Sequence, residues 1–130
     1  MRKLIIDRTN NSPEVILDPE NRIFMISGES RPPDVWQFYN NIILWLDDFS
    51  TSLTEPGGID KAMEFNFNFE YFNSSSAKSI LDICKILSGL RNRGIDLKVN
   101  WHYEKNDFDM LEVGKEMSNI VKFPFAFVES

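Results

Sequence analysis

The sequence has one cysteine, Cys84, and one histidine, His102. A single cysteine excludes a disulfide within the chain, and together the two residues fall short of the four ligands of a structural zinc site. The patterns of three common site classes, G-x-S-x-G, G-x-G-x-x-G and the Walker loop, do not occur. We therefore expect a protein that is not an enzyme and holds no metal and no cofactor, with Cys84 as a buried core thiol.

The chain is also short of basic residues: 14 Lys and Arg oppose 20 Asp and Glu, which gives a net charge of −6. Affinity for nucleic acid comes largely from Lys and Arg that neutralise phosphates, so we expect no nucleic-acid partner. The first residues, MRKLIIDRTNNSP, lack the apolar run of about 7–15 residues found in signal peptides. No run approaches the roughly 20 apolar residues that span a bilayer. We expect a cytoplasmic protein without membrane insertion.

The length of 130 residues suits one domain with its own core, and we expect a single domain over residues 1–130. Its 11 phenylalanines and 3 tryptophans predict dense aromatic packing between strands, with some rings left for a partner. No repeat or low-complexity tract divides the sequence. The strongest interior loop signal is Ser52–Lys61, which contains EPGG.

Alternating apolar and polar residues predict two strands in the second half of the chain. Residues 63–71 read MEFNFNFEY, and residues 95–103 read IDLKVNWHY. Apolar residues at helical spacing predict three helices, over 33–53, from Ser75 to near Gly94, and over 106–121. Short apolar runs between turn residues predict a hairpin or meander over 8–30, and residues 122–128 predict a closing strand.

This order of strands and helices predicts an α/β fold in two layers. Strand–helix–strand units imply parallel strands joined by right-handed crossovers, with each helix packed back on the sheet. Parallel strands covered on both faces read as continuous apolar runs, whereas these strands keep a polar second face. We expect a mixed sheet, an N-terminal hairpin followed by parallel strands, with helices on one face. The open polar face is predicted to carry Glu64, Asn66, Asn68, Glu70, Asp96, Lys98, Asn100 and His102.

Three serines, Ser74–Ser76, follow Asn73 where a predicted strand meets a predicted helix. Free backbone N–H groups and partial positive charge at a helix N-terminus favour a capping side chain or an anion, so one interpretation is a helix cap. A nucleophilic serine is disfavoured, because the only available base, His102, should point to the open face of the sheet. The third interpretation is phosphorylation, since a helix N-terminus stabilises the added charge and Lys78, one turn further on, can pair with it.

Segments along nearly the whole chain resemble the SiaC family of bacterial regulatory phosphoproteins. The matching segments are SPEVILD (12–18), GESRPP (28–33), FYNNIILWL (38–46), EYFNSSSAKSILDI (70–83), VNWHYEKNDFDMLEVGKE (99–116) and KFPF (122–125). The central segment, which contains the serine run, is the most specific. Departures from the family pattern occur at Pro33, Asn41 and Asn106, where an acidic residue, proline and aspartate are expected.

The resemblance implies a STAS-like fold, similar to that of anti-sigma-factor antagonists such as SpoIIAA, which agrees with the two-layer layout. It also implies a switch. In the family, a threonine or serine after the asparagine of the central motif is phosphorylated by a dedicated protein kinase and dephosphorylated by a metal-dependent Ser/Thr phosphatase. The unphosphorylated form binds and activates a diguanylate cyclase, which makes cyclic di-GMP.

Carried over to this sequence, the resemblance makes Ser74 the phosphoacceptor, at a position where the family pattern leads us to expect threonine. Ser75 stays open as the alternative acceptor, because three hydroxyl groups are adjacent. The expected partner-binding residues around the acceptor are Tyr71, Asn73, Ser75, Ser76 and Lys78.

Two other functions stay open on the sequence alone. An anti-sigma-factor antagonist would use the same kind of switch to control transcription, and neighbouring genes would distinguish it from a cyclase activator. A small enzyme would use His102 on the polar face of the sheet, and His102→Ala would then abolish its turnover.

Overall fold

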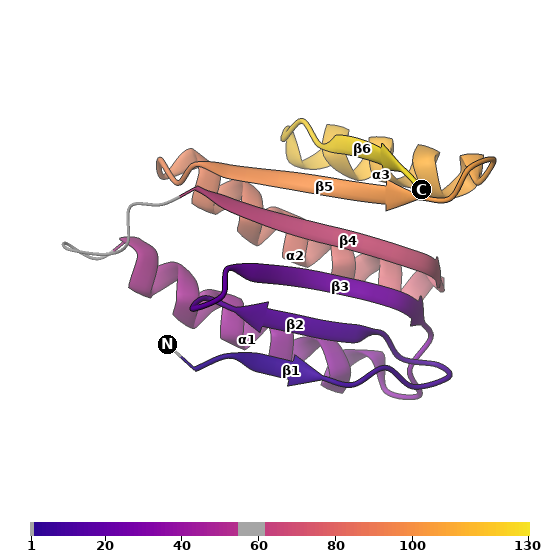
Figure 1. Cartoon of the computed structure of the whole chain (residues 1–130), viewed down its shortest axis with the longest axis horizontal. Helices are drawn as coiled ribbons and strands as arrows, with labels where there is room; N and C mark the ends of the chain where they lie inside the picture. Colours follow the sequence, from indigo (N-terminus) through magenta and orange to yellow (C-terminus); the bar gives the residue numbers. More distant parts are fainter. Residues whose placement is uncertain (1, 55–61) are drawn as a thin grey trace.

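The computed structural model describes residues 2–54 and 62–130 (Figure 1). The described residues form six strands and three helices. In chain order these are β1 (Leu4–Ile6), β2 (Glu14–Asp18), β3 (Ile23–Ser30), α1 (Val35–Thr54), β4 (Met63–Phe72), α2 (Ser74–Asn92), β5 (Leu97–Tyr103), α3 (Phe108–Val121) and β6 (Ala126–Glu129). None of the helices in this part of the chain is both long and apolar enough to span a membrane.

The strands form one sheet whose spatial order follows the sequence, from β1 to β6. The first three strands pair antiparallel through short connections, whereas β3 to β6 pair parallel through α1, α2 and α3. Successive crossovers of the same hand put the helices on one side, and Figure 1 shows all three behind the sheet. The predicted two-layer α/β fold, with an antiparallel start, a parallel remainder and helices on one face, is confirmed.

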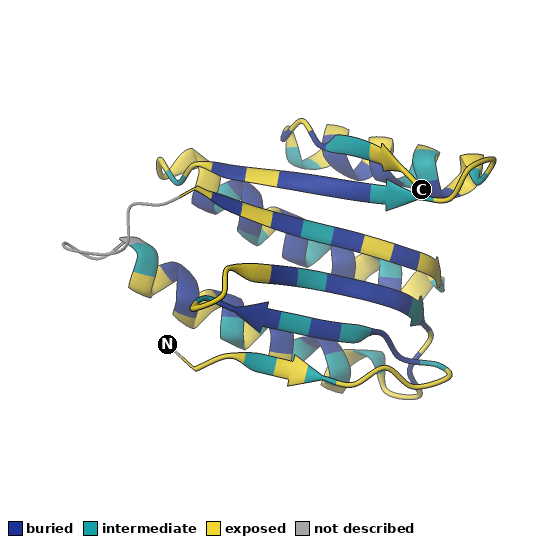
Figure 2. Ribbon diagram, viewed as in Figure 1, coloured by how far each residue is buried: buried dark blue, intermediate teal, exposed yellow. Residues whose placement is uncertain are grey.

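The core between the sheet and the helices is aromatic. Burial alternates along β4, as Figure 2 shows, and after Met63 the buried positions are three phenylalanines whose successive ring centroids lie 4.8 and 6.1 Å apart. The fully buried Trp101 of β5 lies 5.5 Å from the ring of Phe67. Cys84 of α2 is also fully buried, as predicted, and burial raises the pKa of its thiol to about 12. The core residues of β4 and β5 are Met63, Phe65, Phe67, Phe69, Leu97, Val99 and Trp101.

The helices begin and end close to the predicted positions, with two differences. The predicted helix over 33–53 and the predicted loop from Ser52 overlap, and the structure continues helix α1 to Thr54, because Leu53 extends the apolar face and packs against the core. The rest of that predicted loop, residues 55–61, lies outside the described residues. Helix α2 begins at Ser74, one residue earlier than predicted. It ends just before Gly94, whose φ of +98° is the left-handed conformation that terminates a helix.

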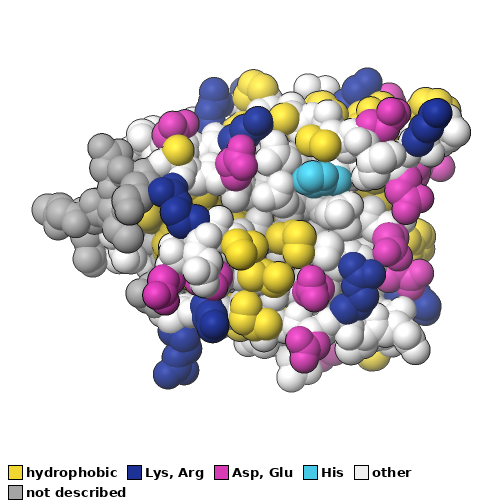
Figure 3. Space-filling view, viewed as in Figure 1, with side chains coloured by type: hydrophobic (Ala, Val, Ile, Leu, Met, Phe, Trp, Pro, Cys, Tyr) yellow, Lys and Arg dark blue, Asp and Glu magenta, His cyan; other side chains and the backbone are white. Residues whose placement is uncertain are grey.

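The face of the sheet opposite the helices is open, and one row of side chains crosses all six strands there. The polar face predicted on β4 and β5 is confirmed, but the neighbouring part over β1–β3 is apolar, as the hydrophobic patch in Figure 3 shows. Ile5 and Ile23 in that part are 48% and 46% exposed. From β1 to β6, the register of the row is Ile5, Ile16, Met25, Asn66, Asn100 and Ala126.

The two asparagines of this row form a small hydrogen-bonded network with His102, two residues further along β5. Asn100 donates from its amide to Oδ1 of Asn66 (3.1 Å), and Nε2 of His102 lies 3.0 Å from the same oxygen. His102 is half-buried, and burial lowers its pKa because the charged ring loses hydration. The neutral imidazole, donating to Asn66, is therefore the form that suits the folded protein.

This shift predicts that the protein loses stability in mild acid. The ordinary pKa of histidine is about 6.5, and that of folded His102 is lower, so the unfolded chain takes up the proton first. The stabilising contribution present above about pH 6.5 is then lost as the pH falls below that value. We expect Tm to drop less between about pH 7.5 and about pH 5.5 in His102→Gln than in the unchanged protein. Equal drops in the two proteins would mean that other groups set the acid sensitivity.

Candidate functional site

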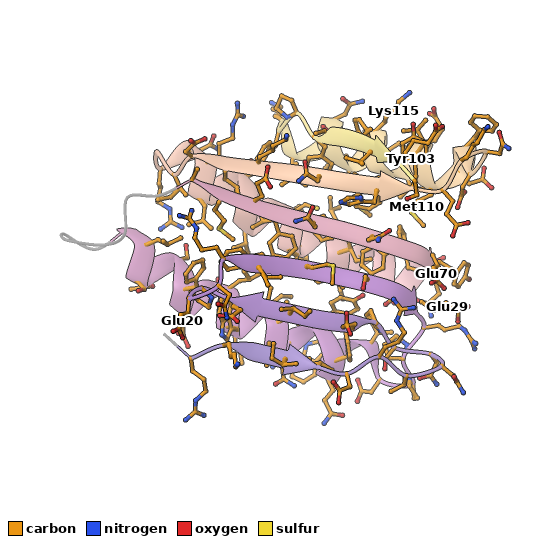
Figure 4. All side chains as sticks on the ribbon, viewed as in Figure 1. Glu20, Glu29, Glu70, Tyr103, Met110 and Lys115 are labelled. Atoms are coloured by element: carbon orange, nitrogen blue, oxygen red, sulfur yellow. The ribbon has the colours of Figure 1, made fainter. Side chains whose placement is uncertain are left out.

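The three serines lie at the edge of the sheet where the parallel strands end. Strand β4 ends at Phe72 and helix α2 begins at Ser74, with Asn73 between them. The ends of β3, β4 and β5 meet at this edge, on the right in Figure 1, and Figure 4 shows Glu29 and Glu70 there, near the ends of β3 and β4. Sites in open α/β sheets commonly form at this edge, because the strand ends and helix N-termini converge.

Asn73 caps helix α2. Its Oδ1 accepts a hydrogen bond from the N–H of Ser76 (2.9 Å), and its carbonyl accepts the first helical bond, from Ala77 (2.9 Å). Its own N–H donates to the carbonyl of Ser30 at the end of β3 (3.1 Å). The predicted cap is therefore present, and Asn73 supplies it rather than a serine hydroxyl.

The three serines have different surroundings. Ser74 and Ser75 are exposed, and neither hydroxyl bonds to another described residue. Ser76 is fully buried; its hydroxyl accepts a bond from Oγ of Ser30 (2.9 Å) and donates to the Ser30 carbonyl (3.1 Å). Another protein can thus reach Ser74 and Ser75, whereas Ser76, which is also predicted to contact a partner, is buried in this structure.

Ser76 belongs to a buried chain of hydroxyl groups that ends at Tyr39 of α1. The Tyr39 hydroxyl lies 2.5 Å from Oγ of Ser30, and because Ser30 donates its proton to Ser76, Tyr39 must donate to Ser30. Burial raises the pKa of Tyr39 to about 12, so its proton is present at neutral pH. Ser30 and Tyr39 are not among the predicted site residues, since no local pattern links them to Ser76, 46 residues beyond Ser30.

Ser74 also lines a groove of about 450 Å³ between α2 and α3. Lys78 of α2 and Glu116 of α3 line the same groove without forming an ion pair with each other in the described structure. Ile120 at the groove is 58% exposed. The contribution of α3 is missing from the predicted site, because the central motif says nothing of which helix packs beside α2. The apolar lining consists of Phe72, Ala77, Leu81, Val113, Met117 and Ile120.

The N-terminus of α2 is better suited to binding an anion than to catalysis. The backbone N–H groups of Ser74 and Ser75 have no acceptor within the helix, and the N-terminus of α2 carries partial positive charge. His102 bonds to Asn66 on the open face, so among the described residues no imidazole is paired with a serine of the run. The arrangement therefore favours a negatively charged group at the start of α2 and offers no activated nucleophile.

Three of the predicted partner-binding residues lie beside Ser74 in the structure. Asn73 and Lys78 line the same groove, Asn73 half-buried in its capping role and Lys78 exposed one turn into α2, and Ser75 is exposed next to Ser74. Tyr71, at the end of β4, is 50% exposed and lines a separate hollow beside the start of α3.

Loss of the cap should destabilise the fold by a measurable amount. Replacing Asn73 with alanine removes the acceptor for the N–H of Ser76, which costs about 1 kcal/mol. The expected result is a lower midpoint of urea denaturation with an unchanged slope. Asn92→Ala, at the exposed last residue of the same helix, is the matched control and should leave the midpoint nearly unchanged. A loss as large in the control would show that the effect is not specific to the cap.

Comparison with known protein sequences places this chain in a family. Residues 6–130 match a family model described as SiaC family regulatory phosphoprotein. An uncharacterised protein of Pseudomonas aeruginosa (strain UCBPP-PA14) is 25% identical over 126 residues, which cover 97% of this chain and 95% of that protein.

Solved structures with the same fold include two of SiaC from Pseudomonas aeruginosa. Apo-SiaC matches with a TM-score of 0.84 and 24% identity, over 98% of this chain and 99% of that chain. SiaC in complex with the diguanylate cyclase SiaD, whose activator it is, matches with a TM-score of 0.86 and 24% identity, over 98% and 99% of the two chains. Because the family model spans nearly the whole sequence, this protein belongs to the SiaC family of regulatory phosphoproteins.

Proposed function

We propose that this protein activates a diguanylate cyclase while Ser74 is unmodified and releases it when Ser74 carries a phosphate. The observation that carries the proposal is the exposed hydroxyl of Ser74, free of any capping role, at the start of α2 and beside an apolar groove. Family membership supports a regulatory role, and the complex of the relative SiaC with the cyclase SiaD supports the output.

The position of Ser74 at the groove makes it a better candidate than Ser75 for the phosphorylation that controls binding. Both hydroxyls are exposed, but Ser74 lines the groove between α2 and α3 and Ser75 does not. A modification at Ser74 therefore changes the surface that offers the apolar contacts, whereas a modification at Ser75 adds charge beside it.

The fold can carry the phosphate without rearranging. A phosphoserine adds a charge of about −1.5 to −2, and the N-terminus of a helix stabilises such a charge. Lys78 lies four residues after Ser74 on the same helix, within the spacing at which side chains pair, and it is exposed. Modification thus changes the charge of the surface while α2 stays in place.

The same charge would release a bound cyclase. A partner that covers the groove and the start of α2 removes water from Ser74, and a desolvated phosphate without a matching cation costs a few kcal/mol. Ile120 at the groove is an exposed apolar side chain suited to the contact, and Tyr71 in the neighbouring hollow is a second exposed ring. Binding and phosphorylation would then exclude each other.

A protein kinase and a metal-dependent Ser/Thr phosphatase complete the proposed cycle. The kinase uses ATP and the cyclase uses GTP, so the protein would act in the cytoplasm, where both nucleotides are available. The phosphatase returns the serine hydroxyl and with it the activating form.

Phosphopeptide mapping tests the site. The unchanged protein, Ser74→Ala and Ser75→Ala are each incubated with host lysate and ATP, and the segment 73–76 is analysed by mass spectrometry. We expect phosphate on this segment in the unchanged protein and in Ser75→Ala, and none in Ser74→Ala. A segment that stays unmodified in all three proteins would contradict the proposal.

A further inference from the structure

The buried chain of hydroxyl groups links β3, α1 and α2 through hydrogen bonds that all involve Ser30. Ser30, the last residue of β3, accepts bonds at its carbonyl from the N–H of Asn73 (3.1 Å) and from the hydroxyl of Ser76 (3.1 Å). Its own hydroxyl donates to Ser76 and accepts from Tyr39 of α1. Ser30, Tyr39 and Ser76 are at most 1% exposed. Each of their three hydroxyl groups donates its proton to an acceptor inside the fold.

We infer that Tyr39 and Ser30 prevent phosphorylation of Ser76 by holding it inside the fold, so that only the exposed serines of the run are left as acceptors. They act through Ser76 and are positioning residues. The inference rests on the proposed function, because it concerns the choice of acceptor by the same kinase.

The physical basis is the cost of exposing Ser76. A kinase transfers the γ-phosphoryl group of ATP to a serine oxygen; the new P–O bond forms as the bond to ADP breaks, and the hydroxyl proton is released. Ser76 can reach a kinase only after its two bonds to Ser30 break and the first turn of α2 opens. Each of these bonds raises the free energy needed to open the turn. A buried hydroxyl without a partner destabilises the closed turn, and so lowers that free energy.

Removing one hydroxyl from the chain should therefore make Ser76 available. Tyr39→Phe keeps the ring in the core but leaves Oγ of Ser30 without its donor. Ser30→Ala removes the bridging oxygen and leaves the hydroxyls of Tyr39 and Ser76 short of a partner. Ser30→Ala removes one of the two bonds that opening must break, which favours the open turn by about fivefold to tenfold. Tyr39→Phe breaks neither of them and acts only by weakening the bond that Ser30 donates to Ser76, so its effect is smaller.

The test uses a background in which Ser76 is the only serine left in the run. Ser74→Ala with Ser75→Ala is incubated with host lysate and ATP, and phosphate on residue 76 is measured with and without Tyr39→Phe, and with and without Ser30→Ala. We expect almost no incorporation in the background, a rise of about fivefold or more with Ser30→Ala, and a smaller rise with Tyr39→Phe. Two variants are used because, if one of them folds poorly, the other still tests the inference.

Ser88→Ala is the matched control. Ser88 lies on the same helix, is buried, and donates to the carbonyl of Val121 (2.9 Å), so its loss removes a comparable bond far from the serine run. Added to the background, it should not raise phosphate on Ser76. Equal incorporation with and without Tyr39→Phe and Ser30→Ala, or an equal rise with Ser88→Ala, would overturn the inference. A fully unmodified native protein in the same lysate would instead overturn the proposed function.

Discussion

Replacing Ser74 with aspartate is expected to raise the Kd for the host diguanylate cyclase by at least about tenfold, equivalent to 1.4 kcal/mol. The substitution puts a negative charge on the rim of the groove between α2 and α3. A bound cyclase would have to desolvate that charge, which is costly unless the partner supplies a cation. Ser74→Ala, which adds no charge, should bind like the unchanged protein. Isothermal titration calorimetry on the three proteins measures the difference.

The loss of affinity cannot be attributed to unfolding, because the same charge favours the helix. An aspartate in the first turn of α2 interacts with the helix dipole and should raise the free energy of unfolding by about 0.3–1 kcal/mol. Ser75→Asp is the matched control: it adds an equal charge at the next residue, which is exposed but does not line the groove. We expect Ser75→Asp to weaken binding less than Ser74→Asp. Equal affinity for Ser74→Asp and Ser74→Ala would contradict the electrostatic mechanism.

Replacing Gly114 with alanine is expected to lower the free energy of unfolding by about 2 kcal/mol. A Cβ at this position of α3 would lie 2.5 Å from Cδ1 and Nε1 of Trp101. The indole cannot give way cheaply, since it is fully buried, donates to the carbonyl of Met110 (3.0 Å) and packs against the ring of Phe125. Overpacking of this kind costs up to about 3 kcal/mol, against a gain of about 1 kcal/mol in helix propensity.

Gly89→Ala separates the gain in helix propensity from the cost of overpacking. Gly89 lies inside α2, and an added Cβ there meets no atom within 4 Å. Only the propensity term applies, so this variant should be more stable than the unchanged protein by about 0.5–1 kcal/mol. Opposite signs for the two glycines in urea denaturation would locate the cost of Gly114→Ala at Trp101. A stabilised Gly114→Ala would show that the indole can move aside.

The elements of this fold could be predicted because their periodicity is local. The alternation of phenylalanines with polar residues over 63–71 permits only a strand with one buried face, and the structure buries that face. The apolar spacing of α2 likewise predicts a helix that ends near Gly94. The C-terminal limit of α1 does not follow from local pattern, because the predicted helix and the predicted loop overlap at Ser52 and Leu53, and the packing of Leu53 against the core extends the helix to Thr54.

The candidate site could be predicted only in part, because half of it comes from distant segments. Asn73 and Ser74 are adjacent in the sequence and belong to the motif that indicates the site. Ser30 and Tyr39 approach Ser76 only after β3 and β4 pair and α1 folds across the sheet. The burial of Ser76 beside two exposed serines follows from those contacts, and no property of three identical side chains in a row could indicate it.

The most direct measurement is the rate at which the host diguanylate cyclase makes cyclic di-GMP from GTP in the presence of this protein. Three samples are compared: the unmodified protein, the protein phosphorylated at Ser74, and the phosphorylated protein after phosphatase treatment. The switch proposed here predicts a rate well above that of the cyclase alone with the first, the rate of the cyclase alone with the second, and a return to the high rate with the third. Equal rates with the unmodified and phosphorylated forms, or no rise with the unmodified form, would contradict it.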